Sequence, residues 1–191
     1  MKKNPPFCIS VTGVQGAGKS FLCKNIISSL QSRQIETACY GDVMTLFMKN
    51  KDHDSIPHLT NDELLSYYPK ASKYLVDYIS ESQSDLFLIQ NHLSVRGGGK
   101  RFDKSSKFEK FFVRAFLVVE PPESLIIERR DNDDNRNRPV ESLNHIKQHQ
   151  GINRNIAKSL SKEMSVPLLF VDNIDYKVTV DNILNWINEI M

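Results

Sequence analysis

Residues 13–20 read Gly13-Val14-Gln15-Gly16-Ala17-Gly18-Lys19-Ser20, and this octet decides which fold the rest of the chain must build. It stands between an apolar run at residues 7–12 and a helical pattern that begins near Lys19. Three glycines let the backbone turn tightly with its N–H groups pointing inward, where they and the positive end of the following helix can hold a polyphosphate. The order of strand, glycine-rich loop and helix therefore predicts a phosphate-binding loop.

The last two residues of the octet carry its charge and its metal-binding oxygen. Lys19 supplies a point charge for the β- and γ-phosphates, and the Ser20 hydroxyl can ligate the Mg²⁺ that accompanies them. The alternative is a glycine-rich turn that matches by chance, and the strand-to-helix setting favours nucleotide binding instead. The rest of the chain must then distinguish a hydrolytic switch, a motor and a kinase with a small acceptor.

Apolar runs recur along the chain with helix-length segments between them. They cover residues 7–12, 36–40, 86–90, 114–119 and 166–171. This alternation indicates βαβ units, and short continuous apolar runs are typical of strands that are buried on both faces of a parallel sheet. We therefore predict an α/β fold of the P-loop NTPase type, a three-layer sandwich with a five-stranded parallel sheet.

Helical patterns fill the intervals between the apolar runs. They cover residues 19–32, 42–50, 61–83, 105–112, 122–131, 140–164 and 178–190. Pro69 lies inside one of them, and we expect that helix to be kinked or split there. The length of 191 residues suits one domain over residues 1–191 and is too short for a motor core with appended modules.

Charge and cysteine content narrow the class of partner and the compartment. The formal net charge of +2 is too small to favour nucleic acid or an anionic membrane as partner, and we interpret the basic stretch from Lys100 to Lys110 as solvated. Cys8, Cys23 and Cys39 lack metal-ligand spacing, and the first two fall on apolar positions, as reduced core residues do. With no signal-like or membrane-length apolar segment, these thiols lead us to expect a cytoplasmic protein.

Four arginines lie within ten residues, at positions 129, 130, 136 and 138. Planar guanidinium groups can grip phosphate oxygens bidentately and offset charge on a transferred phosphoryl group. We interpret residues 129–139 as an arginine-rich lid that excludes water from a kinase site. The alternative is a solvated helix end, in which Asp131, Asp133 and Asp134 neutralise their neighbours.

Three further motifs follow the octet in order along the chain. They are Tyr40-Gly41-Asp42-Val43-Met44, Arg129 with Arg136-Asn137-Arg138, and His149-Gln150-Gly151-Ile152-Asn153-Arg154. Together with the GxxGxGK[ST] form of the octet, they resemble the archaeal-type adenylate kinases, which belong to the P-loop nucleoside monophosphate kinases. The resemblance runs from the first strand to the last helix.

The resemblance implies a site for ATP and Mg²⁺ on residues 13–20 and the adjacent Phe21, with Ser20 at the metal. It also implies that Arg129 and Asn173 lie near the adenine and that Arg136, Arg138 and Arg154 converge on the phosphates. Asp42 is implied to lie near the acceptor or the waters of Mg²⁺, although a helix N-cap is an equal interpretation of its position. Related enzymes are often trimers.

The chain departs from these kinases on the acceptor and metal side. Gln90-Asn91-His92 replaces their Asp-Thr-His, so the carboxylate that helps to hold the Mg²⁺ waters is missing. Lys73 is the nearest basic candidate where they place an acceptor-binding arginine. A loop over residues 94–101 replaces their Pro-rich stretch, and its Arg96 could bind the acceptor or be solvated. His92 could bind an acceptor phosphate or ribose, or brace the strand end internally.

Three hypotheses follow from these features. The first is a nucleoside monophosphate kinase that is adenylate kinase-like and transfers the γ-phosphoryl group of ATP to AMP or a related nucleotide. The second keeps the transfer chemistry with another small acceptor, because the departures fall on that side. The third is a nucleotide-binding regulator with slow ATPase activity.

Overall fold

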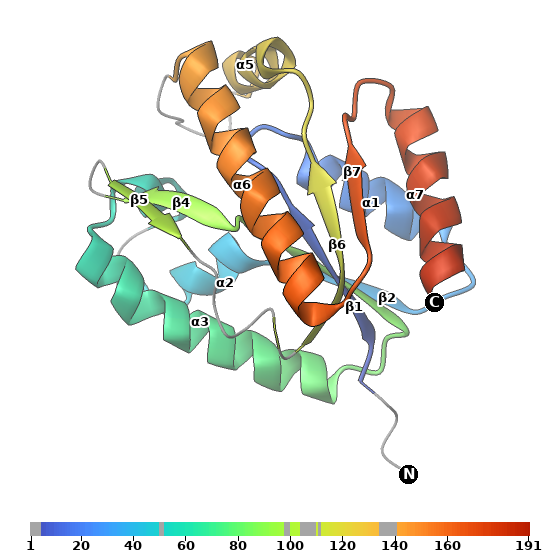
Figure 1. Ribbon diagram of the computed structural model, residues 1–191. Coiled ribbons are helices and arrows are strands. Elements are labelled where there is room, and N and C mark those ends of the chain that lie inside the picture. Colours follow the sequence, from blue (N-terminus) through green and yellow to red (C-terminus); the bar gives the residue numbers. More distant parts are fainter. Residues whose placement is uncertain (1–4, 50–51, 98–99, 104–109, 111, 134–140) are drawn as a thin grey trace.

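The centre of the molecule is a five-stranded parallel β-sheet (Figure 1). The computed structural model describes residues 5–49, 52–97, 100–103, 110, 112–133 and 141–191. The strands of the sheet are, in spatial order, β2 (Ile35–Cys39), β3 (Leu86–Gln90), β1 (Phe7–Thr12), β6 (Val113–Val119) and β7 (Leu168–Val171). They lie within two residues of the predicted runs, and the predicted parallel sheet is confirmed.

Helices cover both faces of this sheet, which makes the fold the predicted three-layer sandwich. One face carries α1 (Lys19–Ser29) and α7 (Tyr176–Ile190), and the other carries α2 (Tyr40–Thr45), α3 (Asn61–Glu81) and α6 (Leu143–Met164) (Figure 1). A short helix, α5 (Glu123–Asp131), follows β6, and a 3₁₀ helix, η1 (His53–His58), precedes α3.

Alternation along each central strand explains why both faces need a cover. In β3, Leu86 and Leu88 belong to the core cluster with α1 and α7, whereas Phe87 and Ile89 belong to the cluster with α2 and α3. All of them are fully buried. Burial of each such side chain stabilises the fold by roughly 1.5–3 kcal/mol relative to its exposure. The continuous apolar pattern of this strand is thus the signature of a two-sided core.

The carboxyl ends of the strands bring the candidate site together. Val11 of β1 is in register with Gln90, the last residue of β3, and β1 and β6 also run parallel. The phosphate loop, residues 13–20, therefore leaves the sheet at the edge where the chain also leaves β3 and β6. Ligands of open parallel α/β sheets bind at this edge.

Two helices differ from their predicted forms. The helix expected at 42–50 begins at Tyr40 and ends at Thr45, because Tyr40 is buried and its hydroxyl donates to the Tyr68 carbonyl at 3.0 Å. The helix around Pro69 runs unbroken from Asn61 to Glu81, so the predicted split is wrong. Pro69 is exposed while Tyr68 and Ala71 on either side are buried, and this packing holds the helix together despite one missing backbone bond.

The segment predicted as a loop at residues 94–101 is a β-hairpin. Strand β4 (Ser94–Gly97) pairs antiparallel with β5 (Lys100–Asp103) in a second sheet. The loop prediction was therefore wrong, because residues on either side of positions 98–99 pair as two short strands. The helix predicted at 105–112 falls mostly outside the described residues.

No helix in the described ranges combines the length and the apolar character needed to cross a bilayer.

The two core thiols give a first prediction. Cys8 and Cys23 are buried free cysteines, as predicted, and burial raises the pKa of each to about 12. At pH 8 only about one in 10⁴ of such thiols is ionised, and the thiolate is the reactive form. Titration of the native protein with a thiol reagent at pH 8 should leave both unmodified, and all three cysteines should react in denaturant. Equal rates under both conditions would contradict this burial.

Candidate active site

The phosphate loop packs closely against the end of β6 and against Asn173, and glycines make both contacts possible. Gly13 has φ +148°, and a Cβ there would lie 2.4 Å from the Val119 carbonyl oxygen at the end of β6. Gly18 has φ +90°, and its Cβ would lie 2.5 Å from Nδ2 of Asn173. Both angles are unfavourable for residues that carry a side chain. The glycine spacing of the octet is thus required by this local geometry.

Lys19 and His92 meet at the first residue of the loop. The Lys19 ammonium donates to the carbonyl oxygens of Gly13 and Val14, each at 3.0 Å. Nδ1 of His92 lies 2.7 Å from the same Gly13 oxygen, and because a carbonyl only accepts, Nδ1 carries the hydrogen. This contact supports the interpretation of His92 as an internal brace. The Lys19 side chain is thus folded back over the phosphate loop.

A chain of hydrogen bonds fixes the Ser20 hydroxyl at the start of α1. The Ser20 hydroxyl donates to Oε1 of Gln90 at 2.7 Å, and Nε2 of Gln90 donates to the Thr37 hydroxyl at 3.1 Å. Thr37 in turn donates to the Leu88 carbonyl at 2.9 Å. Gln90 therefore lies next to Ser20 and orients its hydroxyl without adding a negative charge.

Arg129 joins the loop to the turn after β7. Its Nη1 donates to the Ala17 carbonyl at 3.0 Å and its Nη2 to the Asn173 carbonyl at 2.7 Å. Asn173 is buried, has φ +49° and donates through Nδ2 to the same Ala17 oxygen at 3.1 Å. Partial burial lowers the pKa of Arg129 from its ordinary value, although the group stays cationic. The structure thus brings together Arg129 and Asn173, two residues that the family resemblance implies near the adenine.

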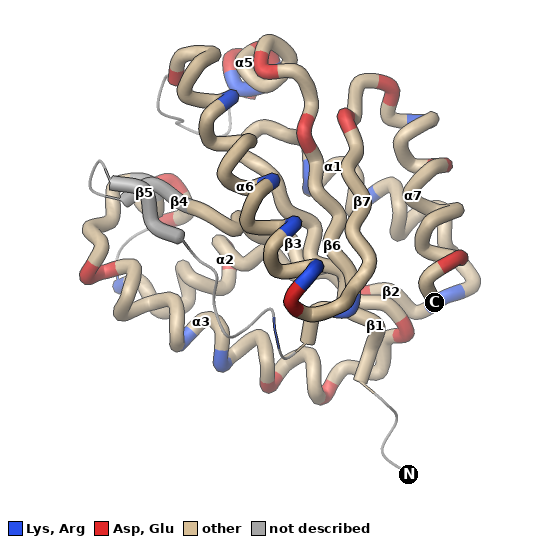
Figure 2. Tube along the Cα trace, viewed as in Figure 1, with Lys and Arg blue, Asp and Glu red and all other residues tan. Residues whose placement is uncertain are grey.

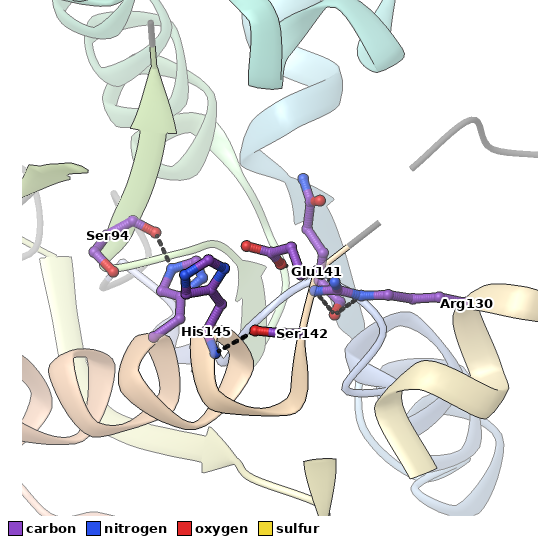
Figure 3. A network of polar contacts seen from close by, with 7 residues as sticks. Ser94, Arg130, Glu141, Ser142 and His145 are labelled. Carbon is purple, nitrogen blue, oxygen red and sulfur yellow. Dashed lines mark hydrogen bonds and ion pairs between the residues drawn. The ribbon is translucent and has the colours of Figure 1, made fainter. Parts of the chain in front are cut away.

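Arg130 was counted in the predicted arginine-rich segment but was not assigned to the site. Its Nε and Nη2 donate to the Gln15 carbonyl at 3.1 and 2.9 Å, and its Nη1 donates to Glu141 at 2.8 Å. Figure 3 shows Arg130 and Glu141 facing each other beside the start of α6. Arg129 and Arg130 are adjacent in the last turn of α5, where acidic and basic residues lie close together (Figure 2), so the sequence gave no signal of which would reach which side of the loop.

Arg154 is held at the end of β6 by a carboxylate. Its Nε and Nη2 donate to one oxygen of Glu120 at 2.9 and 2.7 Å. Glu120 immediately follows Val119, whose carbonyl oxygen faces Gly13, so this ion pair lies close to the beginning of the phosphate loop. The Glu120 side chain is largely buried, whereas half of Arg154 is exposed. Glu120 therefore fixes the orientation of the Arg154 guanidinium, while about half of the Arg154 side chain stays accessible.

Arg154 lies in the middle of α6, and the start of this helix is fixed by an N-cap. The Ser142 hydroxyl accepts from the backbone N–H of His145 at 3.3 Å, as Figure 3 shows. One turn before Arg154, Gln150 is buried and its Nε2 donates to the Pro121 carbonyl at 2.8 Å. These contacts at the carboxyl end of β6 set the register of α6 against the sheet.

The remaining predicted residues are placed as follows. Asp42 is the third residue of α2 and lies 3.7 Å from Nε2 of His53, and the N-cap is Cys39, so the N-cap interpretation of Asp42 is wrong. Phe21 is half-exposed and contacts Tyr176 edge to face. Lys73 is exposed, and among the described residues it pairs with Asp77 on its own helix and does not reach the loop.

Three of the predicted arginines cannot be placed in the site. Arg136 and Arg138 lie outside the described residues, as does the part of the proposed lid at 134–139. Arg96 belongs to β4, and its side chain is outside the described part of the structure.

Comparison with known proteins assigns the chain to a family. A model of the AAA domain family matches residues 12–147, which include the phosphate loop, Gln90 and the two arginines of α5. The chain belongs to this family. The curated relatives of the chain include archaeal adenylate kinases, as the sequence motifs indicated. The adenylate kinase of Thermococcus onnurineus is 25% identical over 180 residues, which cover 90% of this chain and 89% of that protein. The adenylate kinase of Pyrobaculum aerophilum is 28% identical over 76% of this chain and 74% of that protein.

Solved structures of low identity share the fold of this AAA domain chain. A shikimate kinase from Bacteroides thetaiotaomicron aligns with a TM-score of 0.66 at 11% identity, over 95% of this chain and 98% of that one. A deoxyadenosine kinase from M. mycoides aligns with a TM-score of 0.56 at 14% identity, over 96% of this chain and 100% of that one. The predicted P-loop kinase fold is confirmed, and these likenesses extend to the fold alone.

Proposed function

We propose that the protein is an ATP-dependent phosphotransferase, and specifically a nucleoside monophosphate kinase that phosphorylates AMP or a related nucleotide. The observation that carries the proposal is the convergence on one glycine loop of Lys19, the Ser20–Gln90 pair, and Arg129 with Asn173. The archaeal adenylate kinase relatives support the same activity.

The residues at the loop fit a polyphosphate. The backbone at Gly13, Gly16 and Gly18 has positive φ, a conformation that turns successive N–H groups toward one side, ahead of the first turn of α1. Such a nest at a helix N-terminus attracts phosphate oxygens. Lys19 already spans the loop, and exchange of its two carbonyl contacts for phosphate oxygens requires only side-chain rotation. ATP, when bound there, supplies the phosphoryl group for transfer.

The oxygen donors near Ser20 fit Mg²⁺ that is held mainly by phosphate and water. The Ser20 hydroxyl is a hard oxygen ligand of the kind Mg²⁺ prefers, and Gln90 adds a neutral amide in hydrogen-bond contact with it. Since neither group is charged, the protein contributes little electrostatic attraction to the metal at this point. Ser20 would position the ion, and the phosphates of a bound nucleotide would supply most of its attraction.

Arginines offset the charge that moves during transfer. Arg129 is fixed by its hydrogen bonds to the carbonyls of Ala17 and Asn173, where its guanidinium can stack against a base or contact a phosphate. Arg154 is held by Glu120 beside the start of the loop. Phosphoryl transfer between anionic oxygens needs positioning and charge neutralisation, with no covalent intermediate. The role of these residues is thus electrostatic, and we assign Arg136 and Arg138 the same role.

A second candidate activity keeps the transfer and changes the acceptor. It is favoured by Lys73, the basic residue that the resemblance suggests for the acceptor, because in the described part of the chain Lys73 pairs with Asp77 on the exposed face of α3. An acceptor panel of nucleoside mono- and diphosphates and hydroxyl metabolites, assayed with labelled ATP, separates the two. Saturable transfer to AMP supports the nucleotide kinase, and transfer only to a metabolite contradicts it in favour of the second activity.

Gln90 gives a prediction about the metal. Gln90→Glu adds a carboxylate of the same shape beside Ser20 and should lower the Mg²⁺ concentration for half-maximal activity by about tenfold, or ~1.4 kcal/mol of added attraction. Gln90→Leu removes the hydrogen bond to Ser20 without adding charge and should raise it. Activity measured against Mg²⁺ at fixed ATP checks both variants. Identical Mg²⁺ dependence in all three proteins would contradict the placement of the metal at Ser20.

A further inference from the structure

A second group of possible metal ligands lies beyond the phosphate loop, at the carboxyl end of β2. It consists of Cys39, the last residue of β2, Asp42 in the first turn of α2, and His53, the first residue of η1. A ligand atom of each lies within 4.8 Å of those of the other two, and Oδ1 of Asp42 lies 3.7 Å from Nε2 of His53. Three different ligand types thus converge from three elements.

The backbone around Gly41 makes this convergence possible. A Cβ at Gly41 would lie 2.4 Å from Nε2 and 3.0 Å from Cδ2 of His53, so the imidazole lies directly on the backbone between Cys39 and Asp42. Any other residue at position 41 would push the ring away from both partners. The Tyr-Gly-Asp segment therefore has a local role that its nucleotide-kinase resemblance does not explain.

The position of His53 is also fixed from its own side. Asp52 caps η1 by accepting from the backbone N–H and the hydroxyl of Ser55, at 3.0 and 2.9 Å. Ile56 and Leu59 anchor the same segment in the core cluster that contains α2 and α3. Because both ends of η1 are held, the imidazole is presented to α2 without a large entropy cost on binding.

The chemistry of the three groups selects one class of metal. A thiolate, an imidazole and a carboxylate suit Zn²⁺, whereas Mg²⁺ and Ca²⁺ take oxygen ligands. In a tetrahedral zinc site, neighbouring ligand atoms are about 3.3–3.6 Å apart, as the metal–ligand bond lengths require. The 3.7 Å between Asp42 and His53 is close to this range, and rotation of the exposed Asp42 side chain can shorten it. All three ligand atoms lie within 4.8 Å of one another, so a small adjustment of the side chains brings them to a common ion. Three protein ligands leave the fourth position open.

We propose that Cys39, Asp42 and His53 form a binding site for Zn²⁺ or a similar transition-metal ion, with a fourth position open to water or an anionic oxygen. The site lies at the same edge of the sheet as the phosphate loop but on β2, and it does not depend on ATP binding. The cysteine spacing alone gave no sign of it, because two of its ligands are not cysteines and one comes from η1.

Cobalt(II) titration of the metal-free protein tests the proposal. Binding of one Co²⁺ should produce a near-ultraviolet thiolate-to-cobalt charge-transfer band, which Zn²⁺ then removes by displacement. Even residues that only support a ligand are worth about 10–100-fold in metal affinity, so Cys39→Ser and His53→Ala should each weaken Zn²⁺ binding at least that much. His58→Ala, at an exposed histidine of the same 3₁₀ helix, is the matched control and should bind as the wild type does.

A second measurement needs no variant. Zn²⁺ should slow the reaction of Cys39 with a thiol reagent at pH 8 by at least tenfold, while buried Cys8 and Cys23 stay unmodified with and without the metal. Absence of the charge-transfer band, or unchanged Cys39 reactivity at saturating Zn²⁺, overturns the proposal. Equal Zn²⁺ affinity of Cys39→Ser and His58→Ala, with both variants folded by circular dichroism, also overturns it.

Discussion

Replacement of Lys19 by alanine should reduce kcat/KM for phosphoryl transfer by at least about 10³-fold, or ~4 kcal/mol of transition-state stabilisation. The Lys19 ammonium donates to the Gly13 and Val14 carbonyls. It is the only cationic side chain within residues 13–20. A loss of this size is expected because the positive charge acts on phosphate oxygens whose charge shifts during transfer. Steady-state kinetics with ATP and the best acceptor of the panel measure it.

The fold should survive this substitution. Lys19 contributes two hydrogen bonds from a partly exposed position, each worth ~1 kcal/mol, which corresponds to a few degrees of Tm in a chain of this size. Lys24→Ala, at an exposed lysine on the same helix, is the matched control and should retain full activity. Wild-type rates in a folded Lys19→Ala protein would show that transfer does not take place at this loop.

Replacement of Arg154 by alanine should lower kcat by about 10³-fold and change KM for ATP by less than about threefold. Arg154 is implied by the family resemblance to contact the phosphates during transfer, and an arginine that neutralises the transition state is worth roughly 10³–10⁵-fold. Its guanidinium is held by one oxygen of Glu120, beside the residue whose carbonyl faces Gly13. The loss therefore falls on the chemical step more than on binding.

Two further variants separate charge from geometry at this position. Arg154→Lys keeps the charge but loses the two-point contact with Glu120, and it should recover only part of the rate. Lys147→Ala, at an exposed lysine on α6, controls for the general charge of that helix. Single-turnover rates with ATP and acceptor give the comparison. An Arg154→Ala protein with normal kcat would assign the arginine a purely structural pairing with Glu120.

The parts of the fold that the sequence predicted well are those governed by local pattern and two-sided burial. All five strands of the parallel sheet and the helices that flank it were recovered, because runs such as Leu86–Ile89 can be apolar throughout only in a covered parallel sheet. The errors arose where tertiary contacts override local preference. Burial of Tyr40 moved the start of α2, and core contacts on both sides of Pro69 kept α3 whole.

The site divides in the same way. The glycines and Lys19 could be predicted because the loop conformation imposes their spacing on the sequence. The roles of Arg130 and Glu120 could not, since they depend on which way a side chain leaves its helix or strand and which partner it meets. Gln90 was noticed only as a missing carboxylate, whereas in the structure it takes over the contact with Ser20.

The most direct test of the proposed kinase activity follows both nucleotides at once. ³¹P NMR of the purified protein with Mg²⁺, ATP and AMP should show ADP formed from both substrates in equal measure, without release of inorganic phosphate and without ADP formation in the Lys19→Ala protein. Conversion of ATP to ADP and inorganic phosphate while AMP persists unchanged, or nucleotides that stay as they were mixed, would contradict the assignment of a nucleoside monophosphate kinase.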